Sequence, residues 1–168
     1  MADIEALLKQ VTDDPKVREL MAQLVRELVA EALAEQTLET MLVFGDRDRL
    51  DIHPTAKVNN AVLNLSSGTI TVGEYSFFGH GVSVLTGSHD VEKFGAERQD
   101  AIPEEGHDVT IGKGVWVASN ATIVGPCRIG DHAVVGVASL VMDDVEPYQI
   151  VAGSPARVIK TIDHEDGE

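Results

Sequence analysis

The sequence has few cysteines, few aromatic residues and few basic residues. Its single cysteine, Cys127, has no partner for an intrachain disulfide and is compatible with a reducing compartment. Aromatic residues make up 4 % of the 168 residues against 15 glycines, which favours thin aliphatic layers over a core of large rings. Lys and Arg number 13 against 28 Asp and Glu, a net charge of −15. Because nucleic acids and anionic membranes are bound mainly through basic side chains, neither is an expected partner.

Long apolar runs are also missing. No stretch approaches the roughly 20 apolar residues that a membrane-spanning helix needs. The N-terminus reads Met-Ala-Asp-Ile-Glu and has neither the basic start nor the apolar centre of a signal peptide. These absences predict a cytoplasmic protein.

The residues that are present divide the chain into two parts with different periods. Residues 2 to about 42 have a helical period, and Pro15 after Asp13 or Asp14 predicts a helix start. A short helix is expected before it, over residues 3–11. The apolar positions form one wide stripe: Val17, Leu20, Met21, Leu24, Val25, Leu28, Val29 and Ala32. We expect this stripe to pack against the rest of the chain or a sister subunit; a role in acceptor choice is the alternative.

A six-residue period begins at Ile111. The chain there reads IGKGVW, VASNAT, IVGPCR, IGDHAV, VGVASL and VMDDVE. The lead positions are all β-branched: Ile111, Val117, Ile123, Ile129, Val135 and Val141. The fifth positions are all small or medium-sized: Val115, Ala121, Cys127, Ala133, Ser139 and Val145. Chance does not account for six consecutive matches in one phase.

The same pattern is less regular upstream. Its lead residues there are Ile52, Val58, Val72, Phe78 and Val84. Asn64 breaks the aliphatic rule, and residues 68–71 shift the phase by two, which indicates a small bulge or loop at a corner. Residues 90–108 are polar and acidic and have no repeat phase, so they are expected to protrude as a loop.

A six-residue period has a direct structural meaning. A short strand followed by a corner places the lead residue inside a prism and the small residue at the turn, so three sixes complete one triangular coil. We therefore predict a mainly β fold, a left-handed parallel β-helix, over residues 49–162. A helical segment over residues 1–48 precedes it, and residues 163–168 form an acidic tail.

Three motifs in this order resemble one enzyme family. They are residues 86–89 (Thr-Gly-Ser-His), residues 109–117 and residues 152–160. Over residues 50–162 the sequence is similar to the hexapeptide-repeat acyltransferases, in the branch of galactoside, maltose and xenobiotic O-acetyltransferases. The resemblance implies an acetyltransferase that moves an acetyl group from acetyl-CoA to a hydroxyl of a small or carbohydrate-like acceptor. It also implies a homotrimer with acetyl-CoA between subunits and no metal.

The resemblance implies a role for His89 as the catalytic base, because a neutral imidazole can take the proton of an attacking hydroxyl. Without the motif, His89 would be a polar residue at a coil corner. Acetyl-CoA contacts are implied for Ala118, Ser119, Gly136, Val137, Arg157 and Lys160. Acceptor contacts are implied for Asn64 and Arg98. Cys127, at a fifth position, is expected in the core and not as a nucleophile.

Two departures from the family stand out. Met142-Asp143 replaces a common Thr-Lys, which removes a cation from the expected phosphate site, and Ser66-Ser67 replaces an acidic pair. Arg157 and Lys160 can also be read as part of a solvated C-terminal segment.

Three other functions stay open. N-acetylation would use the same base. A non-catalytic trimeric scaffold would keep the fold alone. A γ-type carbonic anhydrase would need three His ligands with two at a short spacing, whereas His80 and His89 are nine residues apart.

Overall fold

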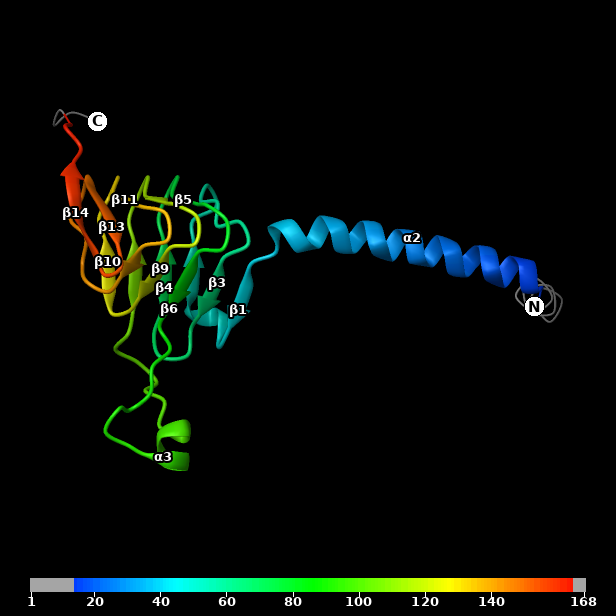
Figure 1. Ribbon diagram of the computed structural model, residues 1–168, viewed down its shortest axis with the longest axis horizontal. Helices are drawn as coiled ribbons and strands as arrows, with labels where there is room; N and C mark the ends of the chain where they lie inside the picture. The colour runs from blue at the N-terminus through cyan, green and yellow to red at the C-terminus, as the bar shows by residue number, and fades with distance from the viewer. Residues whose placement is uncertain (1–13, 165–168) are drawn as a thin grey trace. The chain divides into compact units, whose positions relative to one another are not determined.

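The computed structural model describes residues 14–164, and for residues 31–39 it describes the backbone only. The predicted short helix over residues 3–11 and the end of the acidic tail lie outside these residues. Contacts divide the chain into two compact units, Met1–Glu39 and Thr40–Glu168 (Figure 1).

The first unit contains one long helix, α2 (Pro15–Glu39). It begins where the sequence predicts. The Asp14 carboxylate accepts a hydrogen bond from the Lys16 N–H (2.8 Å), and the Asp14 carbonyl accepts one from the Arg18 N–H (3.0 Å). The Asp14 side chain therefore satisfies one of the N–H groups that a helix start leaves without an intrahelical partner, and the Asp14 carbonyl accepts the first intrahelical bond.

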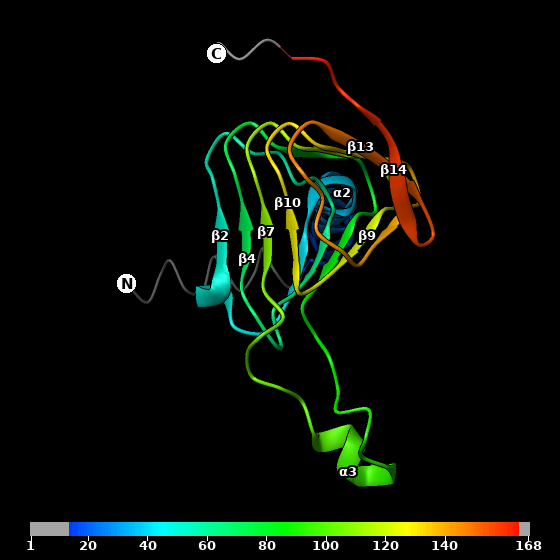
Figure 2. The same ribbon diagram turned by 90° about the vertical axis from the view of Figure 1, so that its left-hand side faces the viewer.

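The second unit is a triangular prism with one parallel sheet on each side (Figure 2). Sheet A contains β1 (Leu42–Phe44), β3 (Val62–Asn64), β6 (Ser83–Leu85), β9 (Thr122–Val124) and β12 (Leu140–Val141). Sheet B contains β2 (Leu50–Ile52), β4 (Ile70–Val72), β7 (Val109–Ile111) and β10 (Cys127–Ile129). Sheet C contains β5 (Phe77–Phe78), β8 (Trp116–Val117), β11 (Val134–Val135), β13 (Gln149–Gly153) and β14 (Ala156–Thr161). Only β13 and β14 pair antiparallel, as a closing hairpin.

The core is the stack of lead residues that the six-residue period predicts. All six lead positions from Ile111 to Val141 are at most 2 % exposed, and the fifth positions are at most 5 % exposed. Strand register aligns the coils: Val72 pairs with Ile111, and Ile111 pairs with Ile129. Each layer of the prism is therefore filled by one aliphatic residue from each side.

Upstream of the protruding loop, one lead position of the six-residue repeat differs from the expected one. Leu63, fully buried, pairs with Val84, so Leu63 and not Asn64 occupies the inward lead position. Relative to a strict six-residue period, one residue is missing before Leu63 and three are added after it. The lead positions therefore shift by a net two residues in the sequence. Ile70 and Thr71 are not a bulge: they lie in the regular strand β4, and the corner is residues 65–69.

The added residues all fall where sheet A leads into sheet B, which we call the A–B corner. Successive A–B corners are residues 45–49, 65–69, 86–108 and 125–126. The first contains a short 3₁₀ turn, Arg47–Arg49, and the third is the predicted protruding loop. That loop contains a helix, α3 (Gly95–Asp100), which the sequence did not predict.

Candidate active site

The base of the protruding loop is held by buried hydroxyl groups. The Thr86 hydroxyl, fully buried, donates to the Asn64 carbonyl oxygen (2.8 Å) and accepts from the Ser67 N–H (3.2 Å). The buried Ser67 hydroxyl accepts from the Ser88 N–H (3.3 Å). These bonds cross from one coil to the next and fix the backbone that leads into His89. Sequence reasoning missed this role of Thr86 and Ser67, because the periodic pattern marks them only as interruptions.

His89 follows directly and has an exposed side chain. Its Nδ1 lies 2.9 Å from the carbonyl oxygen of Arg98 across the loop. A carbonyl oxygen can only accept, so Nδ1 of the neutral ring donates the hydrogen and Nε2 retains the lone pair. The loop therefore sets both the ring orientation and the tautomer of His89.

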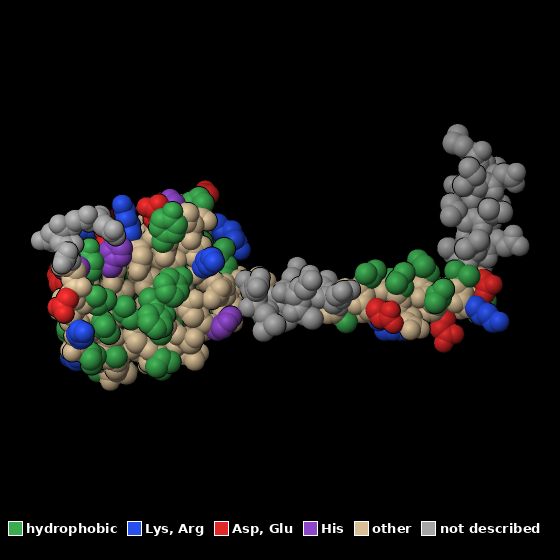
Figure 3. All heavy atoms as spheres, turned by 90° about the horizontal axis from the view of Figure 1, so that it is seen from above, with side chains coloured by type: hydrophobic (Ala, Val, Ile, Leu, Met, Phe, Trp, Pro, Cys, Tyr) green, Lys and Arg blue, Asp and Glu red, His purple; other side chains and the backbone are tan. Residues whose placement is uncertain are grey.

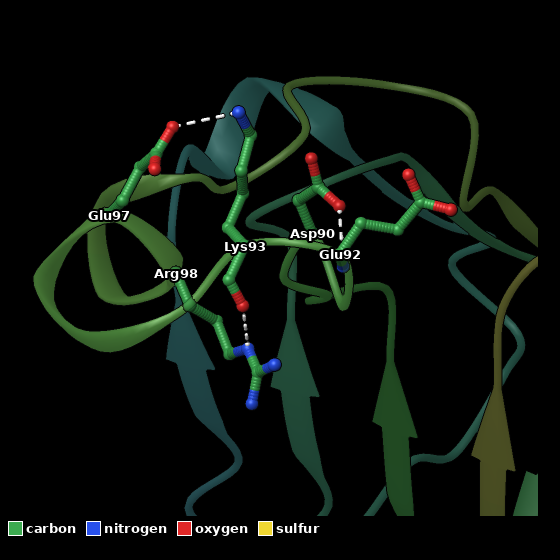
Figure 4. A network of polar contacts seen from close by, with 5 residues as sticks. All are labelled: Asp90, Glu92, Lys93, Glu97 and Arg98. Atoms are coloured by element: carbon green, nitrogen blue, oxygen red, sulfur yellow. Dashed lines mark hydrogen bonds and ion pairs between the residues drawn. The ribbon is translucent and has the colours of Figure 1, made fainter.

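The Arg98 side chain turns back onto its own loop (Figure 4). Its Nε donates to the Lys93 carbonyl, one terminal nitrogen donates to the Val91 carbonyl (3.0 Å), and the guanidinium lies 5.0 Å from the centre of the Phe94 ring. Lys93 in turn forms a 2.7 Å ion pair with Glu97 of α3. These contacts hold the Arg98 carbonyl opposite His89.

Asn64 lies at the preceding A–B corner. Its amide oxygen accepts from the Ser66 N–H (2.9 Å), and a side chain on Gly87 would place its Cβ 2.8 Å from the Asn64 amide. Gly87 is thus required for close packing of the loop on Asn64. His89 and Arg98 thus meet within the protruding loop, and Asn64, at the preceding A–B corner, lies against the start of that loop at Thr86 and Gly87. An acceptor role for Asn64 and Arg98 stays a prediction.

The predicted acetyl-CoA residues lie at another edge, where sheet C leads into sheet A, which we call the C–A corner. Val117 pairs with Val135, so Ala118 and Ser119 of one coil lie next to Gly136 and Val137 of the following coil. The Ala138 N–H donates to the Ser119 carbonyl (3.0 Å). Val137 is 67 % exposed. Two successive corners thus form a continuous exposed edge.

Arg157 and Lys160 lie on β14. One Arg157 terminal nitrogen is 3.9 Å from an Asp143 carboxylate oxygen, and both side chains are largely exposed. Asp143, Asp144 and Met142 line a hollow with Arg157 between the end of β12 and the closing hairpin. The Met142-Asp143 departure seen in the sequence therefore faces one of the two predicted phosphate-binding cations.

Cys127 belongs to the core, as expected. Its side chain is 5 % exposed, and its thiol donates to the Asp143 carbonyl (3.2 Å). Burial, with smaller contributions from Asp144 and Asp143, raises the pKa of the Cys127 thiol to about 12. A thiol with this pKa is not ionised at neutral pH and cannot act as a nucleophile.

Among the described side chains, those of residues 14–30 and 40–164, no three His, Cys, Asp or Glu gather closely enough to hold a metal ion. Within the same residues, none of the helices combines the length and the apolar character needed to cross a membrane.

Comparisons with known proteins agree with this architecture. Residues 108–139 match the family model for the bacterial transferase hexapeptide (six repeats). Serine acetyltransferase 2 of Arabidopsis thaliana is 37 % identical over 125 residues, which are 74 % of this chain and 35 % of that protein. Galactoside O-acetyltransferase of Escherichia coli K12 is 26 % identical over 152 residues, 90 % of this chain and 73 % of that protein.

A solved galactoside acetyltransferase in complex with coenzyme A has a TM-score of 0.61 and 25 % identity, covering 78 % of this chain and 66 % of that one. The chain spans 26–39 % of the length of the serine acetyltransferases that it matches. The repeats, the three sheets and these similarities agree: the chain carries a hexapeptide-repeat transferase domain, folded as the predicted left-handed parallel β-helix.

Proposed function

We propose that this protein transfers an acetyl group from acetyl-CoA to a hydroxyl group of a small or carbohydrate-like acceptor, with His89 as the general base. The observation that carries the proposal is the 2.9 Å contact between His89 Nδ1 and the Arg98 carbonyl. It leaves an exposed Nε2 lone pair on a ring of fixed orientation, which is what a general base requires.

The reaction needs one proton relay. Nε2 of His89 takes the proton of the acceptor hydroxyl while its oxygen attacks the thioester carbon. The imidazolium formed keeps its Nδ1–H bond to the Arg98 carbonyl, which stabilises the added charge. When the tetrahedral intermediate collapses, the same proton passes to the sulfur of the leaving thiolate. No acyl-enzyme is required, in keeping with the buried and protonated Cys127.

The acting unit is proposed to be a homotrimer with its sites between subunits. His89 and the predicted acetyl-CoA residues lie at opposite edges of sheet A, the A–B and C–A corners. Strands rise about 3.3 Å per residue, so a three-residue strand with its turns separates the two corners by on the order of 10 Å or more. A site that uses both groups is more readily built from the A–B corner of one copy and the C–A corner of the next.

The outer faces of the prism support this association. Sheet A exposes Leu42 (53 %) and Phe44 (54 %), and sheet C exposes Phe77 (44 %) and Trp116 (47 %), whose rings stack at 6.0 Å. The outward residues of sheet B are polar: Asp51, Thr71, Thr110 and Arg128. Two different apolar faces favour a head-to-tail contact, which closes into a ring when the rotation permits.

The acceptor class is proposed from the relatives. Galactoside and serine acetyltransferases are named for acceptors that both carry hydroxyl groups. The A–B corner would receive the acceptor, because His89 lies there against the Arg98 carbonyl and Asn64 packs against Gly87, two residues before His89. A cytoplasmic location, where acetyl-CoA is available, suits this activity and the single reduced cysteine.

The proposal is tested by calorimetric titration with acetyl-CoA, followed by an acceptor screen that records released CoA thiol. The screen includes galactosides, maltose and L-serine, with amino sugars to detect N-acetylation. We expect saturable binding near one ligand per chain and thiol release that depends on one acceptor class. No binding of acetyl-CoA at millimolar concentration would contradict the proposal.

A non-catalytic scaffold of the same fold is the second candidate. It is favoured by one observation, the position of Asp143 beside Arg157, which lowers the local positive potential that a polyanionic donor needs. The same titration separates the two candidates, because a scaffold would bind neither acetyl-CoA nor free CoA.

A further inference from the structure

Helix α2 exposes a continuous apolar surface. Its described members, which we call the α2 stripe, are Val17, Leu20, Met21, Leu24, Val25, Leu28 and Val29. Apart from the half-buried Val17, each side chain is between 49 % and 68 % exposed. Figure 3 shows these hydrophobic side chains along one side of the helix and charged side chains along the other. Exposed apolar area of this extent indicates a missing partner.

The face of α2 opposite the stripe is polar. It carries Glu19, Gln23 and Arg26, and the Gln23 side-chain amide donates to the carboxylate of Glu27 (3.0 Å), which lies at the border of the stripe. Such surface pairs contribute only a few tenths of a kcal/mol each, and most helical stability in proteins comes from packing of the apolar face. The helix therefore has one face that needs burial and one that does not.

The width of the stripe indicates how many partners it has. Nine residues separate Leu20 from Val29, and at about 100° per residue they lie about half a turn apart, with Leu24 and Leu28 between them. A two-stranded coiled coil buries only a narrow seam of two positions per heptad. A stripe that covers half of the helix suits a helix with two neighbours.

We infer that the α2 helices of three copies pack against one another as a three-helix bundle. The inference rests on the homotrimer of the proposed function. Only Thr40 and Met41 separate α2 from β1, so in a threefold trimer the C-terminal ends of the three helices are tethered at equivalent points beside the three β1 strands. Short tethers of this kind give effective concentrations in the millimolar range, so a modest apolar contact suffices for association.

An anionic membrane is a poorer occupant of the stripe. Helices that lie on such membranes carry mainly Lys and Arg on their polar face. Here Glu19 and Glu27 stand beside Arg26, so the polar side has no excess of basic residues, and the whole chain has a net charge of −15. Repulsion from anionic headgroups would oppose insertion.

Cysteine cross-linking tests the bundle in the full-length protein. Cys127 is buried and its thiol pKa is about 12, so it stays silent towards mild oxidants and maleimides. Leu24→Cys places a reactive thiol at the centre of the stripe, and Gln23→Cys places one on the opposite face as the matched control. After mild oxidation or treatment with a short bis-maleimide, we expect Leu24→Cys to give covalent dimers in about two thirds of the chains, because the third thiol of each trimer has no partner. Gln23→Cys is expected to stay uncross-linked.

Light scattering and thiol-release assays on the same samples separate the outcomes. A trimer in which Leu24→Cys does not cross-link overturns the bundle and leaves the proposed function standing, with the stripe packed on the prism or another protein. Cross-links found only in particles of twice the trimer mass overturn it as well. A monomeric chain with no acetyl transfer contradicts both.

Discussion

The A–B and C–A corners of the same prism differ in how much their lengths vary. The C–A corners that join the named strands of sheets C and A are residues 79–82, 118–121 and 136–139, each four residues long. The A–B corners range from two residues, 125–126, to the long loop 86–108. The C–A corners are one residue shorter only before Leu63 and stack into a nearly straight edge, which suits the extended acetyl-CoA of the proposed function. The variable A–B corner holds His89 and suits an acceptor that differs between relatives.

The largest effect is expected from replacing the proposed base, His89. His89→Ala is expected to lower acetyl transfer by about 10²- to 10⁴-fold, since a positioned base contributes about that much. Acetyl-CoA affinity and the proposed trimer should be unchanged, because the substitution leaves the C–A corners intact. His53→Ala, an exposed histidine in the first coil, is the control and should retain full turnover. Full turnover of His89→Ala, measured as thiol release, would remove His89 from the reaction.

Removing a hydrogen bond at the base of the protruding loop is expected to have a smaller effect. Thr86→Val removes the hydroxyl that bonds the Asn64 carbonyl and the Ser67 N–H, which costs about 1–3 kcal/mol for buried groups left unpaired. We expect a lower unfolding temperature and a roughly tenfold fall in kcat, because His89 is no longer held in place. Thr86→Ser keeps the hydroxyl and should restore both. An altered acetyl-CoA dissociation constant would show that the two corners are not independent.

A smaller effect is expected from a change of charge at Asp143, near the proposed acetyl-CoA site. Asp143→Lys replaces the carboxylate 3.9 Å from Arg157 with a cation. We expect acetyl-CoA to bind a few-fold more tightly at low salt and the gain to shrink as ionic strength rises, because exposed charges are screened. Asp143→Asn should fall between the two. Calorimetry that finds no change for either variant would place the CoA phosphates elsewhere.

The smallest expected effect is at the end of the variable loop. Backbone and side-chain hydrogen bonds from Thr69 hold the pKa of Asp108 below its usual value, with a smaller contribution from Arg49. A lowered folded-state pKa stabilises the protein above the unfolded pKa of about 3.9, and this is lost as pH falls through the folded value. Asp108→Asn should therefore lower the unfolding temperature slightly at pH 7. The difference should shrink as pH falls below the unfolded pKa and through the folded one; a difference independent of pH would contradict this cause.

The sequence predicted the regular part of the fold because each coil there repeats every 18 residues, as in the pairing of Ile111 with Ile129. The lead position at Leu63 was assigned wrongly. One missing residue and three added residues follow one another there, and the sequence pattern reveals only their net shift. Helix α3 is six residues long and has no buried residue, so it gives no periodic signal.

The candidate site was predictable only through its motif. The contact between His89 and the Arg98 carbonyl joins a side chain to a backbone atom across an irregular loop, and no residue pattern encodes it. The roles of Thr86 and Ser67 likewise depend on which coils lie next to each other, which follows from register and not from composition.

Mixed trimers test most directly whether the A–B corner of one copy works with the C–A corner of the next. One parent is His89→Ala, and the other is Val137→Trp, which blocks the donor edge at an exposed position. Each parent alone should be nearly inactive. If sites lie between subunits, random reassembly of equal amounts restores about one quarter of wild-type thiol release, because one site in four receives both intact corners. Mixed trimers as inactive as their parents would contradict sites between subunits.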